Sequence, residues 1–383
     1  MPGLSSIRTA LLRLLAEDTL RPQSRSVPFL LLSQERSKDR GEDVVRRVIP
    51  ATLTKYFAAN IGVCCLAPTA ARTSKFDDIW GKTMPSQNIA ATNTANAATG
   101  VAIDHGGKRV LLKWHRLRRE MKDPLFSGEV LAAGLKLGAS MEIDLRATRD
   151  GSFAVLHDRT LDRETNGSGP VSAYTGDDIR GLLYTEPARD GTVRHVLTAE
   201  DLAELLGPAQ QDALLQFDMK DDFASVGEGA LDRLEGLFAD RDKHLVVSGD
   251  DTELTLAITD RLPAAKRGLE PSFRLMDLHR AGRKSEVGGQ LTRELSGPIR
   301  PYIVYLNWKL LLDAYADGID LVRICHDHGA RVDAWTFTLA DPDGGFSDDE
   351  WRKLERLLEL GIDQITTDEA VATERAYLLR MGG

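Results

Sequence analysis

From residue 108 to the end of the chain, short runs of β-branched and apolar residues alternate with segments of helical periodicity. Repeated strand–helix units of this kind are typical of a parallel sheet, because each helix returns the chain to start the next strand in the same direction. Roughly eight such units in one piece favour a closed barrel over an open sheet. We therefore predict an α/β fold, a (β/α)8 TIM barrel, preceded by an irregular N-terminal extension.

The expected strands are short and the expected helices follow them. Strands are predicted at RVLLKWH (109–115), MEIDLRA (141–147), FAVLH (153–157), ALLQFDMK (213–220), HLVVSG (244–249), KRGLEP (266–271), PYIVYLN (301–307), RVDAWTF (331–337) and DQITTD (363–368). Helices are predicted at 126–138, 198–207, 227–239, 251–260, 308–328 and 348–360. Thr198 followed by Asp201 indicates a capping box at the start of one of them.

The first hundred residues lack this regular texture. Residues 7–20 suit a short amphipathic helix, whereas NIAATNTANAATG (88–100) is small, polar and without period, as linkers are. We divide the chain into an N-terminal extension of unknown role, residues 1–100, and a barrel domain, residues 108–383.

Charge and hydropathy exclude several classes of protein. The formal net charge is −9, which argues against a general nucleic-acid binder because such binders rely on many Lys and Arg contacts with phosphates. The sequence has no run of 18 or more apolar residues, so no transmembrane segment is predicted. The predicted partner is instead a small molecule, and the oligomeric state is left open.

Cysteine usage bears on the compartment. Cys64, Cys65 and Cys325 are odd in number and lack the spacing of a disulfide framework or a zinc site, so we expect reduced thiols in a cytoplasmic protein. Export is the alternative, because the uncharged residues 56–71 faintly resemble a signal-peptide core.

Carboxylates occupy positions where a buried strand normally carries apolar side chains. Glu142 and Asp144 are two residues apart in MEIDLRA, so their side chains point to the same side of the strand. Asp218 arrives from the next predicted parallel strand. Each has an ordinary explanation in a salt bridge with a nearby Lys or Arg. Three carboxylates at neighbouring strand ends nevertheless make a hard-cation site, suited to Mg²⁺ or Ca²⁺.

Two histidines and two basic residues fall at the same strand ends. His115 and His157 are candidates for general acid and base, because imidazole titrates near neutral pH. Arg116 and Lys220 are candidates for holding a phosphate group beside the cation. A lone histidine is more often a surface or core residue, so the argument depends on the joint placement of these groups.

These residues resemble the glycerophosphodiester phosphodiesterase family. The resemblance is carried by His115-Arg116, by Glu142-Ile143-Asp144, by the Thr148-Arg149-Asp150-Gly151 turn, by His157-Asp158, and by Leu161-Asp162-Arg163 with Thr165, Gly167 and Gly169. QFDMK, AWTF and GIDQITTDEA follow in the order in which the family carries similar segments. The resemblance spans about residues 108–375, and the block 142–169 is its most specific part.

The resemblance implies a metal-dependent TIM-barrel phosphodiesterase. It implies that His115 and His157 form the acid–base pair, one accepting the proton of an attacking glycerol hydroxyl and the other protonating the leaving alcohol. It implies metal ligation by Glu142, Asp144 and Asp218, phosphate contacts from Arg116 and Lys220, and a pocket wall at Trp335. The expected products are an alcohol and glycerol 3-phosphate, which would place the protein in glycerol and lipid metabolism.

Three departures from the family pattern bear on the substrate. Leu117 replaces the glycine after His-Arg, and DPLFSGE (123–129) replaces the family's Pro-Glu-Asn-Thr helix start. Asp218 stands where the family has Glu, so its side chain is one methylene shorter. Two other readings stay open. One is a phospholipase D-like enzyme acting on lysophospholipid or sphingomyelin phosphodiesters, and the other is a non-catalytic ligand-binding barrel.

Overall fold

The structure is a computed structural model, and it describes residues 98–186, 191–207 and 209–382. The predictions made for the N-terminal helix, for Cys64 and Cys65, and for the segment 56–71 lie outside these residues, as does most of the predicted linker. The division of the chain at residues 100 and 108 stays a prediction.

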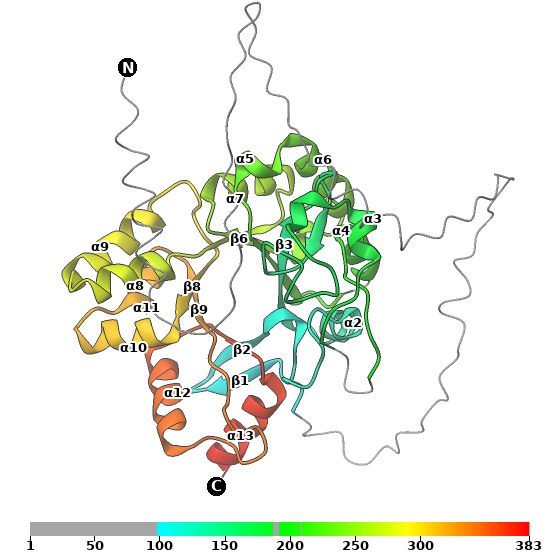
Figure 1. The fold of residues 1–383 in the computed structure, drawn as a ribbon. Coiled ribbons are helices and arrows are strands. Elements are labelled where there is room, and N and C mark those ends of the chain that lie inside the picture. Colours follow the sequence, from blue (N-terminus) through cyan, green and yellow to red (C-terminus); the bar gives the residue numbers. More distant parts are fainter. Residues whose placement is uncertain (1–97, 187–190, 208, 383) are drawn as a thin grey trace, which may run out of the picture. The chain divides into compact units, whose positions relative to one another are not determined.

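Eight parallel strands close into a barrel (Figure 1). They are β2 Lys108–Trp114, β3 Ser140–Ala147, β5 Leu214–Met219, β6 Leu245–Gly249, β7 Lys266–Leu269, β8 Ile303–Asn307, β9 Arg331–Trp335 and β10 Gln364–Thr367. The barrel closes where β2 pairs with both β10 and β3, the latter through Lys113 opposite Ser140 and Trp114 opposite Met141. The predicted (β/α)8 barrel is confirmed.

Two antiparallel strands extend the barrel sheet. β1, Ala102–His105, forms a hairpin with β2, and β4, Phe153–Val155, folds back on β3. β1 was not predicted, because the sequence analysis placed residues up to 100 in a linker and began the barrel at 108. The β3–β4 hairpin carries the chain from Asp144 to His157 within thirteen residues and returns it to the same end of the barrel.

Helices surround the strands, as Figure 1 shows. They are α2 Gly128–Leu137, α3 Gly176–Arg180, α4 Ala199–Leu205, α5 Phe223–Val226, α6 Glu228–Phe238, α7 Thr252–Arg261, α8 Ser272–Arg280, α9 Lys284–Leu295, α10 Trp308–Ala316, α11 Leu321–Asp327, α12 Asp348–Leu360 and α13 Ala370–Gly382. Short 3-10 turns lie at η2 His115–Leu117, η3 Val171–Ala173 and η4 Asp242–His244. Within the described residues, no helix is long and apolar enough to cross a membrane.

Local sequence explains where several helices begin and end. Thr198 and Asp201 form the predicted capping box of α4, which satisfies backbone N–H groups at the first turn. The helix expected over 308–328 is wrong as a single helix. Gly318, with φ of 82°, ends α10, and the Asp320 side chain accepts a hydrogen bond from Arg323 N to start α11.

Helix α2 packs closely on the strands that carry the predicted site. Gly134, inside α2, faces Trp114 and Met141, and an added Cβ would lie 2.9 Å from the Trp114 ring and closer still to the Met141 sulfur. Trp114 and Met141 are fully buried. Gly134 therefore lets the helix approach β2 and β3 without displacing either side chain.

We expect Gly134→Ala to lower the free energy of unfolding by about 1–3 kcal/mol, because the new methyl group overpacks a filled site. Gly236→Ala is the matched control: Gly236 also lies inside a helix, α6, and nothing lies within 4 Å of an added Cβ. That variant should gain about 0.5–1 kcal/mol from its better helix propensity. Denaturant unfolding of both variants checks the pair, and equal shifts would contradict the packing argument.

Candidate active site

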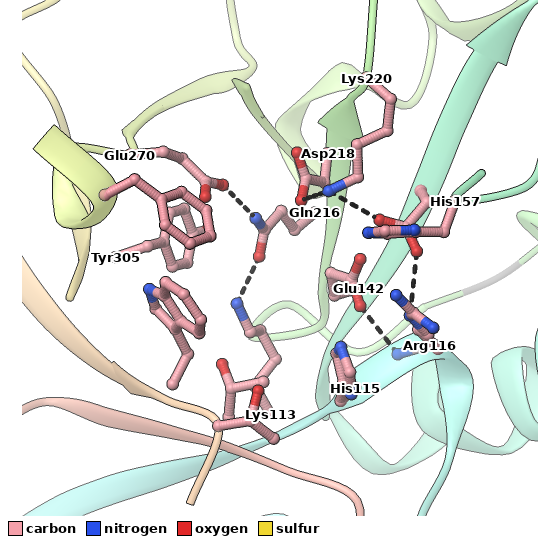
Figure 2. Close-up of a pocket in the computed structure, with 15 residues that line it drawn as sticks. Lys113, His115, Arg116, Glu142, His157, Gln216, Asp218, Lys220, Glu270 and Tyr305 are labelled. Carbon is pink, nitrogen blue, oxygen red and sulfur yellow. Dashed lines mark hydrogen bonds and ion pairs between the residues drawn. The ribbon is translucent and has the colours of Figure 1, made fainter. Parts of the chain in front are cut away.

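A cavity of about 300 Å³ opens at the carboxyl ends of the barrel strands. All eight residues predicted to form the site line it: His115, Arg116, Glu142, Asp144, His157, Asp218, Lys220 and Trp335. Figure 2 shows Glu142 between the two histidines, and Asp218 beside Lys220. The structure thus brings the eight residues together, while the role of each stays a prediction.

The three carboxylates converge because of the strand register. Glu142 and Asp144 are two apart on β3, and Asp144 lies directly opposite Asp218 of the parallel strand β5. One oxygen from each of the three carboxylates lies within 4.8 Å of the others. Asp218 joins this cluster although it is shorter than the Glu that the family pattern would place there.

Two basic residues balance this negative charge. Lys220 Nζ lies 3.0 Å from Asp144 Oδ1 and 2.5 Å from Asp218 Oδ2. Arg116 Nε lies 3.1 Å from Asp144 Oδ2, and the Arg116 backbone N–H donates to Glu142 Oε2 at 2.8 Å. Each carboxylate of the cluster therefore has at least one cationic or N–H partner from the chain itself, and Asp144 has two.

Burial and charge set the protonation of the cluster. Burial, reinforced by Asp144, raises the pKa of Glu142. Burial and the nearby Glu270 raise the pKa of Asp218 to about 8. Burial would also raise the pKa of Asp144, but Lys220 and Arg116 outweigh it and lower the pKa. Glu142 and Asp218 are therefore harder to ionise than free carboxyl groups, and a positive charge beside them would favour their ionised forms.

The donor set fits a divalent cation. Three carboxylate oxygens from adjacent strands are the hard ligands that Mg²⁺ and Ca²⁺ prefer. Asp144 Oδ2 is buried and makes no hydrogen bond, although Arg116 lies close to it. An additional positive charge at this point would stabilise the ionised form of all three side chains.

A single arginine fixes the strand ends around the cluster. Arg146, buried at the end of β3, donates from Nε to His157 O at 2.9 Å and from Nη1 to Lys220 O at 2.6 Å. It also forms an ion pair with Asp221 at 2.9 Å. Arg146 thereby holds His157 and Lys220 at set positions relative to β3, a role that the sequence analysis did not foresee.

The turn between β3 and β4 directs His157 into the cavity. Thr148 Oγ1 donates to Asp150 Oδ1 at 2.7 Å, and Gly151 adopts a φ of 77°, which glycine accommodates without strain. The chain then pairs back on β3 and reaches His157. The turn therefore sets the path of the segment that brings His157 to the cavity.

Each histidine is held by its own carboxylate. His115 Nδ1 lies 2.8 Å from Asp368 Oδ1, and His157 Nδ1 lies 2.9 Å from Asp158 Oδ1. Arg163 forms a two-point ion pair with Asp158, which lowers the pKa of that carboxyl well below its usual range. With Nδ1 engaged, the Nε2 atom of each imidazole remains available for a substrate.

Asp158 and Asp368 are functional candidates that sequence reasoning missed. Asp158 had a signal, since it directly follows His157. Asp368 ends the predicted strand 363–368, but its pairing with His115 had no local signal, because the two residues lie 253 positions apart in the chain. They meet only because β2 and β10 are neighbours in the closed barrel.

Leu117 occupies a backbone conformation that glycine favours. Arg116 and Leu117 have φ values of 52° and 57°, and each such residue costs about 1–2 kcal/mol in a non-glycine. Leu117 is fully buried, which offsets this cost. The replacement of glycine therefore keeps a left-handed turn after His115. Phe126, from the altered segment 123–129, donates from its backbone N–H to Arg116 O at 2.9 Å.

Further polar and aromatic residues line the cavity beyond the predicted set: Lys113, Gln216, Glu270, Phe273, Tyr305, Thr336 and Thr366. Lys113 and Gln216 lie two positions before His115 and Asp218 on their strands, so strand alternation would have predicted that they share a side with them. The sequence analysis did not draw that consequence.

Comparison with known proteins agrees with this geometry. Residues 129–230 match the model of the Glycerophosphoryl diester phosphodiesterase family. A glycerophosphodiester phosphodiesterase of Caldanaerobacter subterraneus is 25% identical over 260 residues, which cover 65% of this chain and 89% of that protein. One of Bacillus subtilis is 50% identical over 42 residues, covering 11% and 14% of the two chains.

Solved structures share the fold. A protein of Silicibacter pomeroyi superimposes with a TM-score of 0.54 at 20% identity, covering 73% of this chain and 96% of its own. A glycerophosphodiester phosphodiesterase of Parabacteroides distasonis gives a TM-score of 0.50 at 18% identity, covering 70% and 97%. Both support the closed barrel.

Barrel and matched segment together define an enzyme of the phosphoric diester hydrolase class, as predicted. The predicted relationship to the glycerophosphodiester phosphodiesterase family is confirmed as well.

We expect Asp368→Asn to lower the pKa of His115. Burial would lower that pKa in the native protein, but the Asp368 hydrogen bond and the charge of Glu142 outweigh it and raise it above its ordinary value. NMR titration of the imidazole in the metal-free protein checks the shift. Asp317→Asn is the control, since Asp317 contacts another histidine, His279, at 2.7 Å.

The sign of the linked stability change follows from the raised pKa. The His115–Asp368 contact stabilises the fold fully below about pH 6.5, and this contribution is lost as pH rises through the folded-state pKa. The stability deficit of Asp368→Asn should therefore be largest in mild acid, where His115 is protonated while Asp368, whose pKa is lowered by this contact against the effect of burial, is still ionised, and it should shrink in alkali. An unchanged His115 pKa in the variant would contradict the assignment.

Proposed function

We propose that the protein hydrolyses glycerophosphodiesters to an alcohol and glycerol 3-phosphate, and that residues 108–383 carry the activity. The observation that carries this proposal is the pair of histidines, each oriented by a carboxylate, in the same cavity as a three-carboxylate cluster. A non-catalytic barrel would have no need of two such oriented imidazoles.

Glu142, Asp144 and Asp218 would hold a divalent cation, Mg²⁺ or Ca²⁺. When bound, such a cation supplies Lewis-acid polarisation of the phosphoryl group and neutralises charge that develops on it. The raised pKa values of Glu142 and Asp218 support this proposal, because both carboxylates gain from an added positive charge.

Arg116 and Lys220 would contact the phosphate. Both line the cavity, and both already face the carboxylate cluster. Lys220 has its pKa raised by Asp218 and Asp144 against the opposing effect of burial, so it stays protonated. Two fixed cations beside the phosphate position it and offset its charge without reorganisation during the reaction.

The histidines would divide the proton transfers. The Asp368 hydrogen bond and the charge of Glu142 raise the pKa of His115, which favours its protonated form and suits the general acid that protonates the leaving alcohol. His157 would then accept the proton of the attacking hydroxyl, with Asp158 stabilising the imidazolium that forms. In this assignment, the His115–Asp368 pair serves the protonation of the leaving alcohol, and the His157–Asp158 pair serves the deprotonation of the attacking hydroxyl.

We place this activity in the cytoplasm, within glycerol and lipid metabolism. Cys325 is a free, buried thiol, as expected of a protein in a reducing compartment. The substrate is a small phosphodiester, in keeping with a cavity of about 300 Å³.

His157→Ala should reduce kcat/KM for glycerophosphocholine by about 100- to 10,000-fold, the usual contribution of a general acid–base group. Release of choline and glycerol 3-phosphate measures the loss. His195→Ala serves as the control, because His195 is exposed and its imidazole contacts only a backbone carbonyl, that of Arg180. Full turnover by His157→Ala would sink the acid–base assignment.

Removal of divalent cations should abolish activity, and Mg²⁺ or Ca²⁺ should restore it. In the wild type, the cation should also raise the melting temperature, since a ligand of the folded state stabilises it. Asp218→Asn should lose this thermal shift, whereas Asp349→Asn, at an exposed helix start, should retain it. Activity that survives exhaustive chelation would rule out the cation.

A panel of substrates that includes lysophospholipid and sphingomyelin distinguishes the proposed activity on glycerophosphodiesters from the phospholipase D-like alternative.

A further inference from the structure

The cavity has a second half that the proposed reaction leaves unused. Lys113 on β2, Gln216 on β5, Glu270 after β7 and Tyr305 on β8 line it, on the side away from His157 and Arg116 (Figure 2). We propose that this half is a subsite for the terminal hydroxyl of the substrate's glycerol group, with Lys113 as its main specificity-determining residue. The inference rests on the proposed function and adds to it the orientation of the substrate, with the glycerol group deep in the barrel and the head group toward the mouth.

A network of hydrogen bonds fixes the polar groups of this half. Lys113 Nζ donates to Gln216 Oε1, and Gln216 Nε2 donates to Glu270 Oε1 at 3.1 Å. Ser248 Oγ accepts from Gln216 Nε2 at 2.9 Å and donates to Glu270 Oε1 at 2.8 Å. Because Gln216 is held at both ends, its amide cannot turn, and Lys113 and Glu270 keep set positions.

The network leaves hydrogen-bonding capacity free. The Lys113 ammonium has three N–H groups, of which Gln216 takes one, while Asp333 Oδ2 lies 3.6 Å away, too far for a normal hydrogen bond. Among the described residues, neither Glu270 Oε2 nor the Tyr305 hydroxyl has a hydrogen-bond partner. The Lys113 ammonium can therefore donate a hydrogen bond to a ligand, Glu270 Oε2 can accept one from it, and the Tyr305 hydroxyl can do either.

A hydroxyl group suits this combination better than a cation or an alkyl group does. A hydroxyl donates and accepts at once, which matches Lys113 and Glu270 together. A quaternary ammonium would be repelled by Lys113, which is 3% exposed and lies 4.0 Å above the Tyr305 ring. An alkyl group would leave buried polar atoms without partners.

Aromatic side chains complete the wall of this half. The rings of Phe273 and Trp335 lie 5.7 Å apart and both line the cavity. They offer an apolar face to the carbon atoms of a polyol, while Lys113 and Glu270 offer polar contacts to its oxygens. Polyols have both kinds of surface.

The subsite lies at a suitable depth. Lys113 and Gln216 each precede a residue of the reaction centre, His115 and Asp218, by two positions on their strands. Two residues of strand correspond to about 6.6 Å. A phosphate near His115 thus places the glycerol deeper in the barrel and the head group toward the mouth.

Two diesters test the proposal: glycerophosphocholine, and its analogue in which propane-1,2-diol replaces glycerol and the terminal hydroxyl is missing. The analogue keeps the hydroxyl next to the phosphodiester. Wild type should prefer glycerophosphocholine by about 10- to 100-fold in kcat/KM, the effect of one hydrogen bond to a charged group. Lys113→Met should reduce this ratio to near one.

Lys108→Met is the matched control and should keep the wild-type ratio. Lys108 lies at the other end of β2, where its Nζ forms an ion pair with Asp363 at 2.8 Å. If circular dichroism shows Lys113→Met unfolded, Glu270→Ala carries the same expectation, a ratio near one. A wild-type ratio near one, or an unchanged ratio in the folded variant, would overturn the subsite alone. No turnover of either diester by wild type with Mg²⁺ or Ca²⁺ would overturn the proposed function and the subsite with it.

Discussion

Repulsion among three carboxylates, two of them buried, governs the arrangement of the site. Glu142, Asp144 and Asp218 have oxygens within 4.8 Å of one another, and like charges this close interact strongly where they are shielded from solvent. Lys220 and Arg116 contact the cluster and supply positive charge that partly offsets this repulsion. Two fixed cations do not fully compensate three carboxylates: burial and the neighbouring acidic groups raise the pKa values of Glu142 and Asp218. The same shortfall of positive charge favours a divalent cation.

Strand β3 is the element that makes this cluster possible. Its outward residues, such as Ile143 and Leu145, are fully buried in the hydrophobic core, which fixes its register. A slip of one residue would turn Glu142 and Asp144 into that core. Arg146 then joins the ends of β3, β4 and β5 by hydrogen bonds to His157 O and Lys220 O. Packing and catalysis thus depend on one register.

Sequence reasoning succeeded where a local period carried the information. The strand alternation predicted the barrel, and the spacing of Glu142 and Asp144 predicted that they share a face. It failed where partners lie far apart in the chain. The Asp368 contact with His115 depends on barrel closure, and the split of 308–328 into α10 and α11 depends on the left-handed turn at Gly318. No local pattern encodes the first, whereas the second had a local signal in Gly318, a residue type that commonly ends helices.

The pairing of β2 with β10 brings a histidine from the start of the barrel domain into contact with an aspartate from its end. His115 lies just after the first barrel strand, and Asp368 just after the last. During synthesis, the three carboxylates and His157 therefore emerge long before Asp368, the partner of His115, does. His115 has no carboxylate partner until the final strand pairs with the first. Orientation of this imidazole is thus linked to completion of the barrel.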